Sequence, residues 1–397
     1  MLTCRALRPG TVAVVSLLAA LAGAAGVVVA GKTGGWLRDD TQTVVVRESL
    51  PPSASKTVVL SKPVLGHGFR PDLIYLARSR GVVTVFARFG GTAASEGSGF
   101  VVSSAGYILT AAHVVSASGS RSVATAANSV FVQFSDGDRV RAAVVGVDPY
   151  DDVGLLRVSP KVHSLDPLPM GSSANVRVGE PVATIGSPFG NRNSLSVGVI
   201  SATHRTIPSL LSSYDLLDAI QTDAPINEGN SGGPLLDSAG RVIGINAQIR
   251  SQVGGGFEGV AFAVPIDTAI RSLAQLLARG HVTYAYAGLT TEDLTPPIAR
   301  RFGYAATAGA LIDRVDTRGP AARAGLRAGS RDVVVAGQEV TVGGDAIVAI
   351  DDIPVASSDD VARFISERLL PGQVANFTIV RGRHHLRVPV TLGSRRP

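Results

Sequence analysis

Residues 221–249 read QTDAPINEGNSGGPLLDSAGRVIGINAQI. They distinguish between two architectures that their central motif permits, an all-β fold and an α/β-hydrolase fold. That motif, GNSGGP at 229–234, places a serine between glycines. A nucleophilic serine needs a tight turn with few side chains, because successive backbone N–H groups must point at the oxygen of the tetrahedral intermediate. The motif also fits GxSxG, the nucleophile turn of α/β-hydrolases, but that turn must open a helix. Pro234 and the strand-like RVIGINAQI follow instead, which favours an all-β fold.

Short β-rich runs recur between about residues 72 and 265, broken by Gly, Pro, Asn and Asp. Strands at this spacing indicate an all-β barrel or sandwich and not alternating βα units. The 45 Gly and 22 Pro fit many short strands and turns. The segment IDTAIRSLAQLLARG, residues 266–280, then has apolar residues at helical spacing and ends in glycine, which predicts a closing helix and a domain boundary.

Two further motifs precede Ser231. TAAHVV at 110–115 places His113 between two apolar runs, where a histidine taken alone is more often an ordinary core residue. DPYDDV at 148–153 places an acidic cluster at the start of a strand, where a carboxylate can accept the imidazole N–H. The order His, Asp, Ser along the chain is that of chymotrypsin-type enzymes. Three such motifs together favour a serine protease over a glycine-rich turn.

In these motifs the chain resembles the HtrA (Deg) family of serine proteases with an appended PDZ domain. The similarity extends from about Gly97 to the C-terminus, and it includes VATIGSPFG at 182–190, GIN at 244–246 and FAVP at 262–265. It implies a mostly β chain: a chymotrypsin-like double β-barrel over 72–280, followed by one α+β PDZ domain over 281–397.

The resemblance also implies a role for each catalytic residue. Ser231 attacks the peptide carbonyl, and His113 takes its proton and passes it to the leaving amine. Asp152, which directly precedes the strand, matches the acidic member of the triad in preference to Asp151. The oxyanion hole is expected at Gly229, Asn230 and Ser231, with the N–H groups of the first and last as donors.

The substrate pocket is predicted from residues near the serine. The position six residues before Ser231, where an Asp would select Arg or Lys, is Pro225. Ile226 lies beside it, and Ala247 and Gln248 lie on the facing strand. We therefore expect a small apolar pocket that takes Val, Ala or a similar side chain.

The C-terminal part begins with AYAGL at 285–289, in which Ala287, Gly288 and Leu289 resemble the carboxylate-binding loop of PDZ domains. GPAARAGLRAG and GDAIVAIDD resemble the helix-turn and strand that follow in that fold. Residues 330–343 lie between those two pieces and are interpreted as an inserted hairpin, which covers the groove, extends the sheet or contacts another subunit. A helix is expected within SSDDVARFISERL, residues 357–369.

The N-terminal part predicts a location outside the cytoplasm. Residues 11–30 carry no charge and are long enough to cross a bilayer as a helix. Positive charges within residues 1–10 favour keeping that end in the cytoplasm, and residues 31–71 read as a linker. A cleaved signal peptide, giving a secreted or periplasmic protein, is the alternative.

Several ligand classes are not expected. Cys4 is the only cysteine and no HExxH pair occurs, so we predict no metal and no cofactor. The net charge of +6 arises from scattered basic residues, which argues against nucleic-acid binding.

The family resemblance implies an ATP-independent, homotrimeric endopeptidase that acts on unfolded or damaged proteins and binds C-terminal peptides through its PDZ domain. A catalytically silent PDZ adaptor is the alternative from another class. An esterase of the α/β-hydrolase type would have to use His281 or the pair His384 and His385, which no βα alternation supports.

Overall fold

The computed structural model describes residues 68–90, 93–118, 124–187, 193–212, 214–227, 229–249 and 259–395. The predicted cytoplasmic end, the membrane anchor and most of the linker lie outside these ranges, so they stay predictions. Of the helices inside the described ranges, none is both long and apolar enough to cross a membrane.

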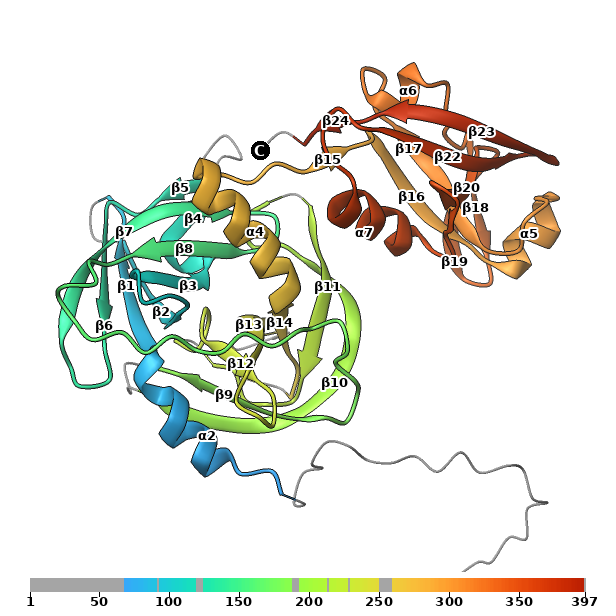
Figure 1. Cartoon of the computed structure of the whole chain (residues 1–397). Coiled ribbons are helices and arrows are strands. Elements are labelled where there is room, and N and C mark those ends of the chain that lie inside the picture. The colour runs from blue at the N-terminus through green and yellow to red at the C-terminus, as the bar shows by residue number, and fades with distance from the viewer. Residues whose placement is uncertain are drawn as a thin grey trace, which may run out of the picture. The chain divides into compact units, whose positions relative to one another are not determined.

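Six antiparallel strands close the first barrel in the order β1-β2-β3-β8-β7-β6 (Figure 1), and β1 pairs with β6 to complete it. Two short helices accompany the barrel: α2 (Pro71–Arg78) before β1, and α3 (Ala112–Val115) after β3. A side hairpin of β4 (Ser116–Ser118) and β5 (Ala124–Ala126) follows α3. The barrel strands are β1 (Val82–Arg88), β2 (Ala94–Val101), β3 (Tyr107–Ala111), β6 (Ser129–Gln133), β7 (Arg139–Asp148) and β8 (Val153–Arg157).

The second barrel closes in the order β10-β11-β14-β13-β12-β9, with β9 paired to β10. Helix α4 (Ile266–Arg279) follows it and ends at Gly280, whose φ of 76° is the left-handed conformation that glycine adopts readily. The predicted closing helix is thus confirmed. The strands are β9 (Pro181–Gly186), β10 (Ser194–Pro208), β11 (Asp215–Thr222), β12 (Pro234–Leu236), β13 (Val242–Ile249) and β14 (Ala261–Pro265).

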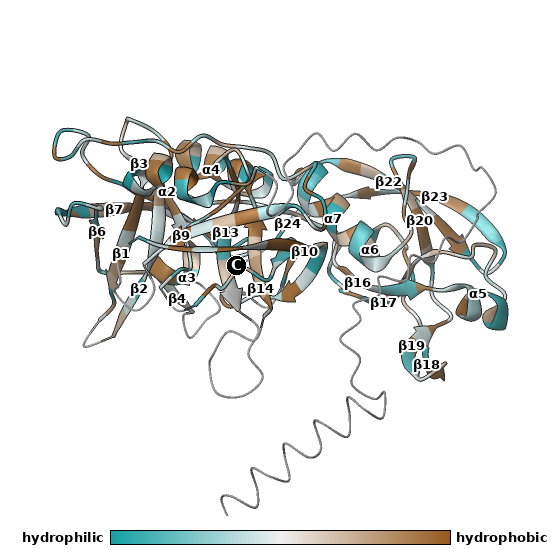
Figure 2. Ribbon diagram, turned by 90° about the horizontal axis from the view of Figure 1, so that it is seen from below, coloured by the Kyte–Doolittle hydropathy of each residue, from teal (hydrophilic) through white to brown (hydrophobic). Residues whose placement is uncertain are grey.

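One apolar core joins the two barrels. Phe100 and Leu155 from the first barrel belong to the same buried cluster as Ile185 and Ile245 from the second. Figure 2 shows hydrophobic residues in the barrel strands, alternating with more polar ones. Burial of each such side chain contributes roughly 1.5–3 kcal/mol to stability, so the shared core holds the two barrels together. The predicted catalytic residues lie where the two barrels meet.

The C-terminal part is the predicted α+β domain. Its main sheet has the order β16-β17-β20-β22-β23, with β21 (Ile353–Pro354) paired to β20, and the short strands β15 (Ala285–Tyr286) and β24 (Gly393–Ser394) pair separately. The helices are α5 (Pro296–Phe302), α6 (Pro320–Arg323) and α7 (Ser358–Arg368). The main strands are β16 (Leu289–Leu294), β17 (Gly309–Val315), β20 (Ala346–Ile350), β22 (Val374–Arg381) and β23 (His384–Thr391).

The insertion at 330–343 is a hairpin, as predicted. Strands β18 (Arg331–Val335) and β19 (Gln338–Val342) pair only with each other within the described chain, so the hairpin does not extend the main sheet. Val340 and Val342 are buried in an apolar cluster with Ile298 of α5. The hairpin therefore packs on its own domain.

Candidate active site and peptide-binding loop

The turn that carries Ser231 belongs to the second barrel but is held by β2 of the first. The Ser98 hydroxyl donates to the Gly229 carbonyl at 2.6 Å, and the Ser98 backbone N–H donates to the Ser231 carbonyl at 2.7 Å. Ser98 is fully buried, so these bonds are shielded from water. The serine turn is thus attached to the barrel that carries His113.

Gly232 permits this attachment because it has no side chain. Its φ is +85°, and a Cβ placed there would lie 2.2 Å from the Ser98 carbonyl oxygen and 2.4 Å from Thr110 Oγ1. Thr110 lies in β3, three residues before His113. Any side chain at position 232 would therefore push the serine turn away from the strand that leads to the histidine.

His113 and Asp152 are joined by two hydrogen bonds. His113 Nδ1 lies 2.7 Å from Asp152 Oδ2, and the His113 backbone N–H donates to Asp152 Oδ1 at 2.9 Å. Because an ionised carboxylate only accepts hydrogen bonds, the imidazole proton belongs on Nδ1. That tautomer leaves Nε2 as an acceptor, which is what a general base requires.

Asp152 is fixed in an unusual backbone conformation. Its φ of 53° lies in the left-handed region, which Asp tolerates better than most residues, and its side chain is buried. Its carbonyl also accepts the N–H of Ala112 at 3.1 Å. The turn before β8 and helix α3 are therefore connected through backbone as well as side chain.

The pair shifts the ionisation of the histidine. Burial lowers the pKa of His113, but the charge of Asp152 and the hydrogen bond to it outweigh burial, so that the pKa is raised above the ordinary 6.5. The carboxylate thereby stabilises the imidazolium that a general base forms when it takes a proton.

The Ser231 hydroxyl points elsewhere in this conformation. It donates to the Ala247 carbonyl of β13 at 3.1 Å, and no hydrogen bond between Ser231 and His113 occurs among the described residues. The structure therefore unites His113 with Asp152 and holds the serine turn against β2 and β3, while the serine hydroxyl is bonded to the second barrel.

Two residues of the predicted oxyanion hole differ in the hydrogen bonding of their backbone N–H groups. The Asn230 N–H donates to the Asn227 carbonyl at 2.9 Å, so it closes the turn. The N–H of Ser231 has no acceptor among the described residues, which leaves it available to a substrate.

The predicted carboxylate-binding loop lies between β15 and β16. The Ala287 carbonyl accepts the N–H of Ala321 at 2.8 Å, and the Gly288 carbonyl accepts the N–H of Asp316 at 2.9 Å. These bonds fix the loop just before Leu289, where β16 begins. Because β16 is the first strand of its sheet, its outer edge has no strand partner within the described chain.

Helix α7 and the inserted hairpin contact opposite faces of β16. Asp293 accepts hydrogen bonds from the N–H and hydroxyl of Ser358 at the start of α7, at 2.7 and 2.8 Å. The neighbouring Glu292 accepts the N–H of Thr341 in the hairpin at 3.0 Å. Successive strand residues point to opposite faces, so the hairpin does not cover the β16 face that α7 contacts.

The trypsin-like peptidase domain family matches residues 97–245, and the PDZ domain family matches residues 286–392. The solved structure of the HtrA-type protease AlgW with a tripeptide is 31% identical, with a TM-score of 0.69, and the match covers 83% of this chain and 98% of that one. This chain belongs to the HtrA protease family.

Other similar proteins are named serine endoproteases. The serine endoprotease from Yersinia pestis is 26% identical, with a TM-score of 0.60, over 82% of this chain and 98% of that one. Proteins named probable periplasmic serine endoprotease DegP-like are 36% identical in Pseudomonas fluorescens and 39% identical in Halomonas elongata, over 76% and 75% of this chain. The HtrA-family chain spans only 57% and 56% of the length of these two curated relatives.

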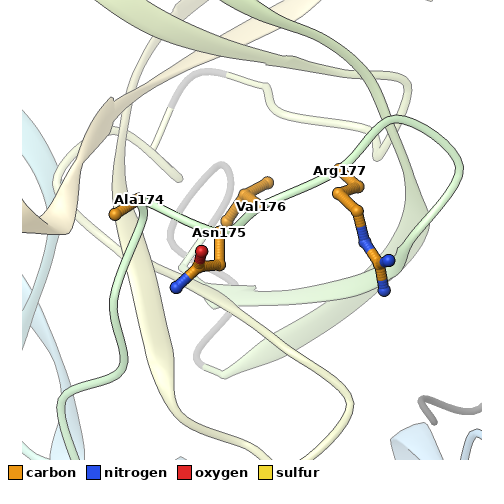
Figure 3. Close-up of a pocket in the computed structure, with 4 residues that line it drawn as sticks. All are labelled: Ala174, Asn175, Val176 and Arg177. Atoms are coloured by element: carbon orange, nitrogen blue, oxygen red, sulfur yellow. The ribbon is translucent and has the colours of Figure 1, made fainter.

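Two of the four predicted pocket residues of this HtrA-family chain are buried. Ile226 and Ala247 are each 1% exposed, and the Pro225 carbonyl is 3.5 Å from Nδ2 of Asn230. Gln248 lies in β13, but its side chain is not among those that the structure describes. Figure 3 shows a different hollow, lined by Ala174, Asn175, Val176 and Arg177, none of which is a predicted site residue.

The sequence of this HtrA-family member did not reveal the supporting residues of the site. Ser98 and Thr110 approach the serine turn from strands more than 100 residues away in the chain. Only the small residues of GSGF at 97–100 signal such a close approach. No group of three or more His, Cys, Asp and Glu side chains in the described ranges is arranged to hold a metal ion.

Proposed function

We propose that this HtrA-family chain is a serine endopeptidase whose catalytic residues are Ser231, His113 and Asp152. The two hydrogen bonds between the histidine and the aspartate carry the proposal, because they set the tautomer and the orientation of a general base. The glycine-flanked serine turn, held against the same barrel, supports the assignment of the nucleophile.

The proposed reaction begins with a rotation of the Ser231 hydroxyl from the Ala247 carbonyl to Nε2 of His113. The histidine takes the hydroxyl proton while the serine oxygen bonds to the peptide carbonyl carbon, and Asp152 stabilises the imidazolium that results. The histidine then gives its proton to the leaving amine as the C–N bond breaks. Water attacks the acyl-enzyme with the same base, which releases the acid and restores the serine.

The oxyanion of the tetrahedral intermediate is proposed to bind the N–H groups of Gly229 and Ser231. The N–H of Ser231, which has no acceptor in the described part of the chain, supports this role, whereas the N–H of Asn230 already closes the turn. Loss of one such donor typically lowers the rate by about 10²–10³.

A small apolar side chain is proposed to occupy the pocket near Pro225, Ile226, Ala247 and Gln248. No carboxylate stands at Pro225 to attract a basic side chain, and Ile226 and Ala247 are apolar residues. Cleavage-site profiling by mass spectrometry should give mainly Val or Ala before the cut bond, and a profile dominated by Lys or Arg would contradict this pocket.

The C-terminal domain is proposed to bind peptides that end in a free carboxylate. The peptide would pair with the outer edge of β16, and the N–H groups of the loop Ala287, Gly288 and Leu289 would hold its carboxylate. The AlgW structures, one with a tripeptide and another with a decapeptide, are protein–peptide complexes of the same family and support peptide binding.

The proposal extends to the substrates, the assembly, the domain boundaries and the location of the chain. We propose unfolded or damaged proteins as substrates, a homotrimer, domains at 72–280 and 281–397, and a location outside the cytoplasm. The periplasmic relatives support that location. We propose that residues 11–30 anchor the chain in the membrane and are not cleaved.

Casein digestion by the wild type and by Ser231→Ala tests the proposal. Loss of the nucleophile should lower turnover by about 10⁶-fold. Ser103→Ala, on the turn after β2, is the matched control and should keep full activity. Equal digestion by Ser231→Ala and the wild type would contradict the catalytic assignment, and no digestion by either, with peptide binding intact, would favour the adaptor.

A further inference from the structure

A second group of ionisable side chains lies beside the turn that carries Asp152. Asp148, at the end of β7, is fully buried, and Tyr284, shortly after α4, is 7% exposed. The Tyr284 hydroxyl oxygen lies 2.5 Å from Asp148 Oδ2 and 2.6 Å from Asp151 Oδ2. One phenol therefore bridges two carboxyl groups.

This arrangement requires one more proton than the phenol supplies. The Tyr284 hydroxyl has a single hydrogen, so it can donate to only one of the two carboxyl oxygens. The second oxygen must donate to the phenol oxygen, and it can do so only as a protonated carboxyl. The cluster of Tyr284, Asp148 and Asp151 therefore holds one shared proton in addition to the phenol hydrogen.

The hydrogen-bond pattern places that proton on Asp151. Asp148 accepts from the Ser272 hydroxyl at 2.6 Å, from the N–H groups of Tyr150 and Asp151 at 3.0 and 3.3 Å, and from Tyr284. Four donors suit an ionised carboxylate. Asp151 has only the phenol as a side-chain hydrogen-bond partner within the described residues.

The electrostatic surroundings agree with this assignment. Burial raises the pKa of Asp151, and the charge of Asp148 adds to it, giving a pKa of about 7. Burial also raises the pKa of Asp148 and Tyr284. Because the folded-state pKa of Asp151 exceeds its ordinary 3.8, folding stability decreases as the pH rises from about 4 to about 7.

Two arginines and two further tyrosines complete the charged and titratable surroundings. Arg271 of α4 and Arg395 near the C-terminus lower the pKa of Asp151, but less than burial and Asp148 raise it. The guanidinium of Arg395 lies 5.2 Å from the Tyr150 ring centre and 4.3 Å from that of Tyr214. Burial raises the pKa of Tyr150 to about 12, so this phenol stays neutral.

The cluster is connected to the catalytic carboxylate through the backbone. Asp148 binds the N–H groups of the next turn, and Asp152 follows that turn in a left-handed conformation with φ of 53°. Loss of the shared proton would place two negative charges on either side of one phenol. Their repulsion would strain the turn that sets the position of Asp152.

We propose that Tyr284, Asp148 and Asp151 form a one-proton cluster that positions Asp152, so that loss of the shared proton lowers catalytic turnover. This inference rests on the proposed protease activity for its effect on rate, but the shared proton itself can be measured without that activity. The three residues are positioning residues, because none of them contacts His113 or Ser231 in the described structure.

A titration of the full chain carrying Ser231→Ala tests the shared proton. Carboxyl ¹³C NMR should show one carboxyl that keeps its proton to about pH 7, and Asp151→Asn should remove that transition. Two carboxyls that both ionise near pH 4 would overturn the cluster. The surface variant Asp136→Asn is the control and should leave the transition in place.

The kinetic test compares kcat and KM across pH for peptide cleavage. Wild-type kcat should fall as the pH rises above about 7, and Asp151→Asn, whose amide can donate to the phenol permanently, should abolish this fall. Tyr284→Phe and Asp151→Ala should lower kcat about tenfold with KM within twofold, since small displacements of catalytic groups cost up to about 10²-fold. Tyr214→Phe, on the same aromatic group, should behave like the wild type.

Superimposable pH profiles of the wild type and a folded Asp151→Asn variant would overturn the positioning role. Folding is checked by near-UV circular dichroism. If no variant and no wild type cleaves peptide, the proposed function fails, whereas the NMR titration still decides whether the proton is shared.

Discussion

Replacing Asp152 by Asn removes one charge and one acceptor from the catalytic pair with almost no change in volume. Asp152 accepts the backbone N–H of His113 with Oδ1, at 2.9 Å, and faces Nδ1 with Oδ2, at 2.7 Å. An Asn side chain has one acceptor oxygen and one donor NH₂ group, so it can satisfy only one of these two donors.

Neither orientation of the amide reproduces both contacts of the carboxylate. If its oxygen keeps the backbone N–H, its NH₂ faces Nδ1, and the imidazole proton must move to Nε2, where it blocks transfer from Ser231. If the amide is reversed, its NH₂ faces the backbone N–H of His113, so two donors face each other and neither has an acceptor. With the imidazolium also deprived of a counter-charge, kcat should fall by about 10⁴-fold, which corresponds to about 5.4 kcal/mol in activation free energy.

The assay is turnover of a fluorogenic peptide by Asp152→Asn at pH 7–9. Asp136→Asn is the matched control, because Asp136 also pairs with a histidine, His163, at 3.0 Å, but on the surface of the first barrel. The control should keep wild-type kcat. A folded Asp152→Asn variant whose kcat is within tenfold of the wild type would refute the role given to the carboxylate.

Three further outcomes are expected. Burial lowers the pKa of His113 but Asp152 raises it more, so kcat/KM of the Asp151→Asn variant, which should lack the fall expected above about pH 7, should rise with pH about a midpoint above 6.5. A midpoint below 6.5 in that pH profile would contradict this. Gly232→Ala, whose Cβ would lie 2.2 Å from a carbonyl oxygen, should lower kcat about 10²-fold in the same peptide assay, and an unchanged rate would show that the turn can move at no cost. Arg381→Met would leave the fully buried Asp345 without its ion pair, so urea unfolding should show that the free energy of unfolding of the C-terminal domain falls by about 3–5 kcal/mol. An unchanged free energy of unfolding would mean that water solvates the carboxylate instead.

Local patterns predicted much of the fold. The glycine at 280 and the helical period before it placed the end of α4 correctly, and the Pro and strand pattern after the serine turn excluded an α/β-hydrolase. The hairpin at 330–343 was also predicted, because its valines and its Ala-Gly turn are local signals. Three helices were missed: α2, of eight residues, α3, of four, and α5, of seven, are too short for a clear period.

Contacts between distant residues were beyond local patterns. The order of His113, Asp152 and Ser231 along the chain predicts a triad, but it does not predict that the serine hydroxyl bonds to a strand carbonyl. Tyr284 meets Asp151 across 133 residues, and nothing in the spacing of the two signals that contact. Such pairs depend on how both barrels and the following segment pack, which no single stretch of sequence encodes.

The close packing of Gly232 against β2 and β3 makes the proposed hydrolysis depend on both barrels together. A chain divided within the connection at 159–180 would yield one fragment with the base and another with the nucleophile, and each fragment alone would be inert. If the two fragments were fused to two interacting proteins, peptide cleavage would return only when those proteins bind each other. The connection at 159–180 is therefore a suitable place to split the chain for a reporter of protein–protein interaction.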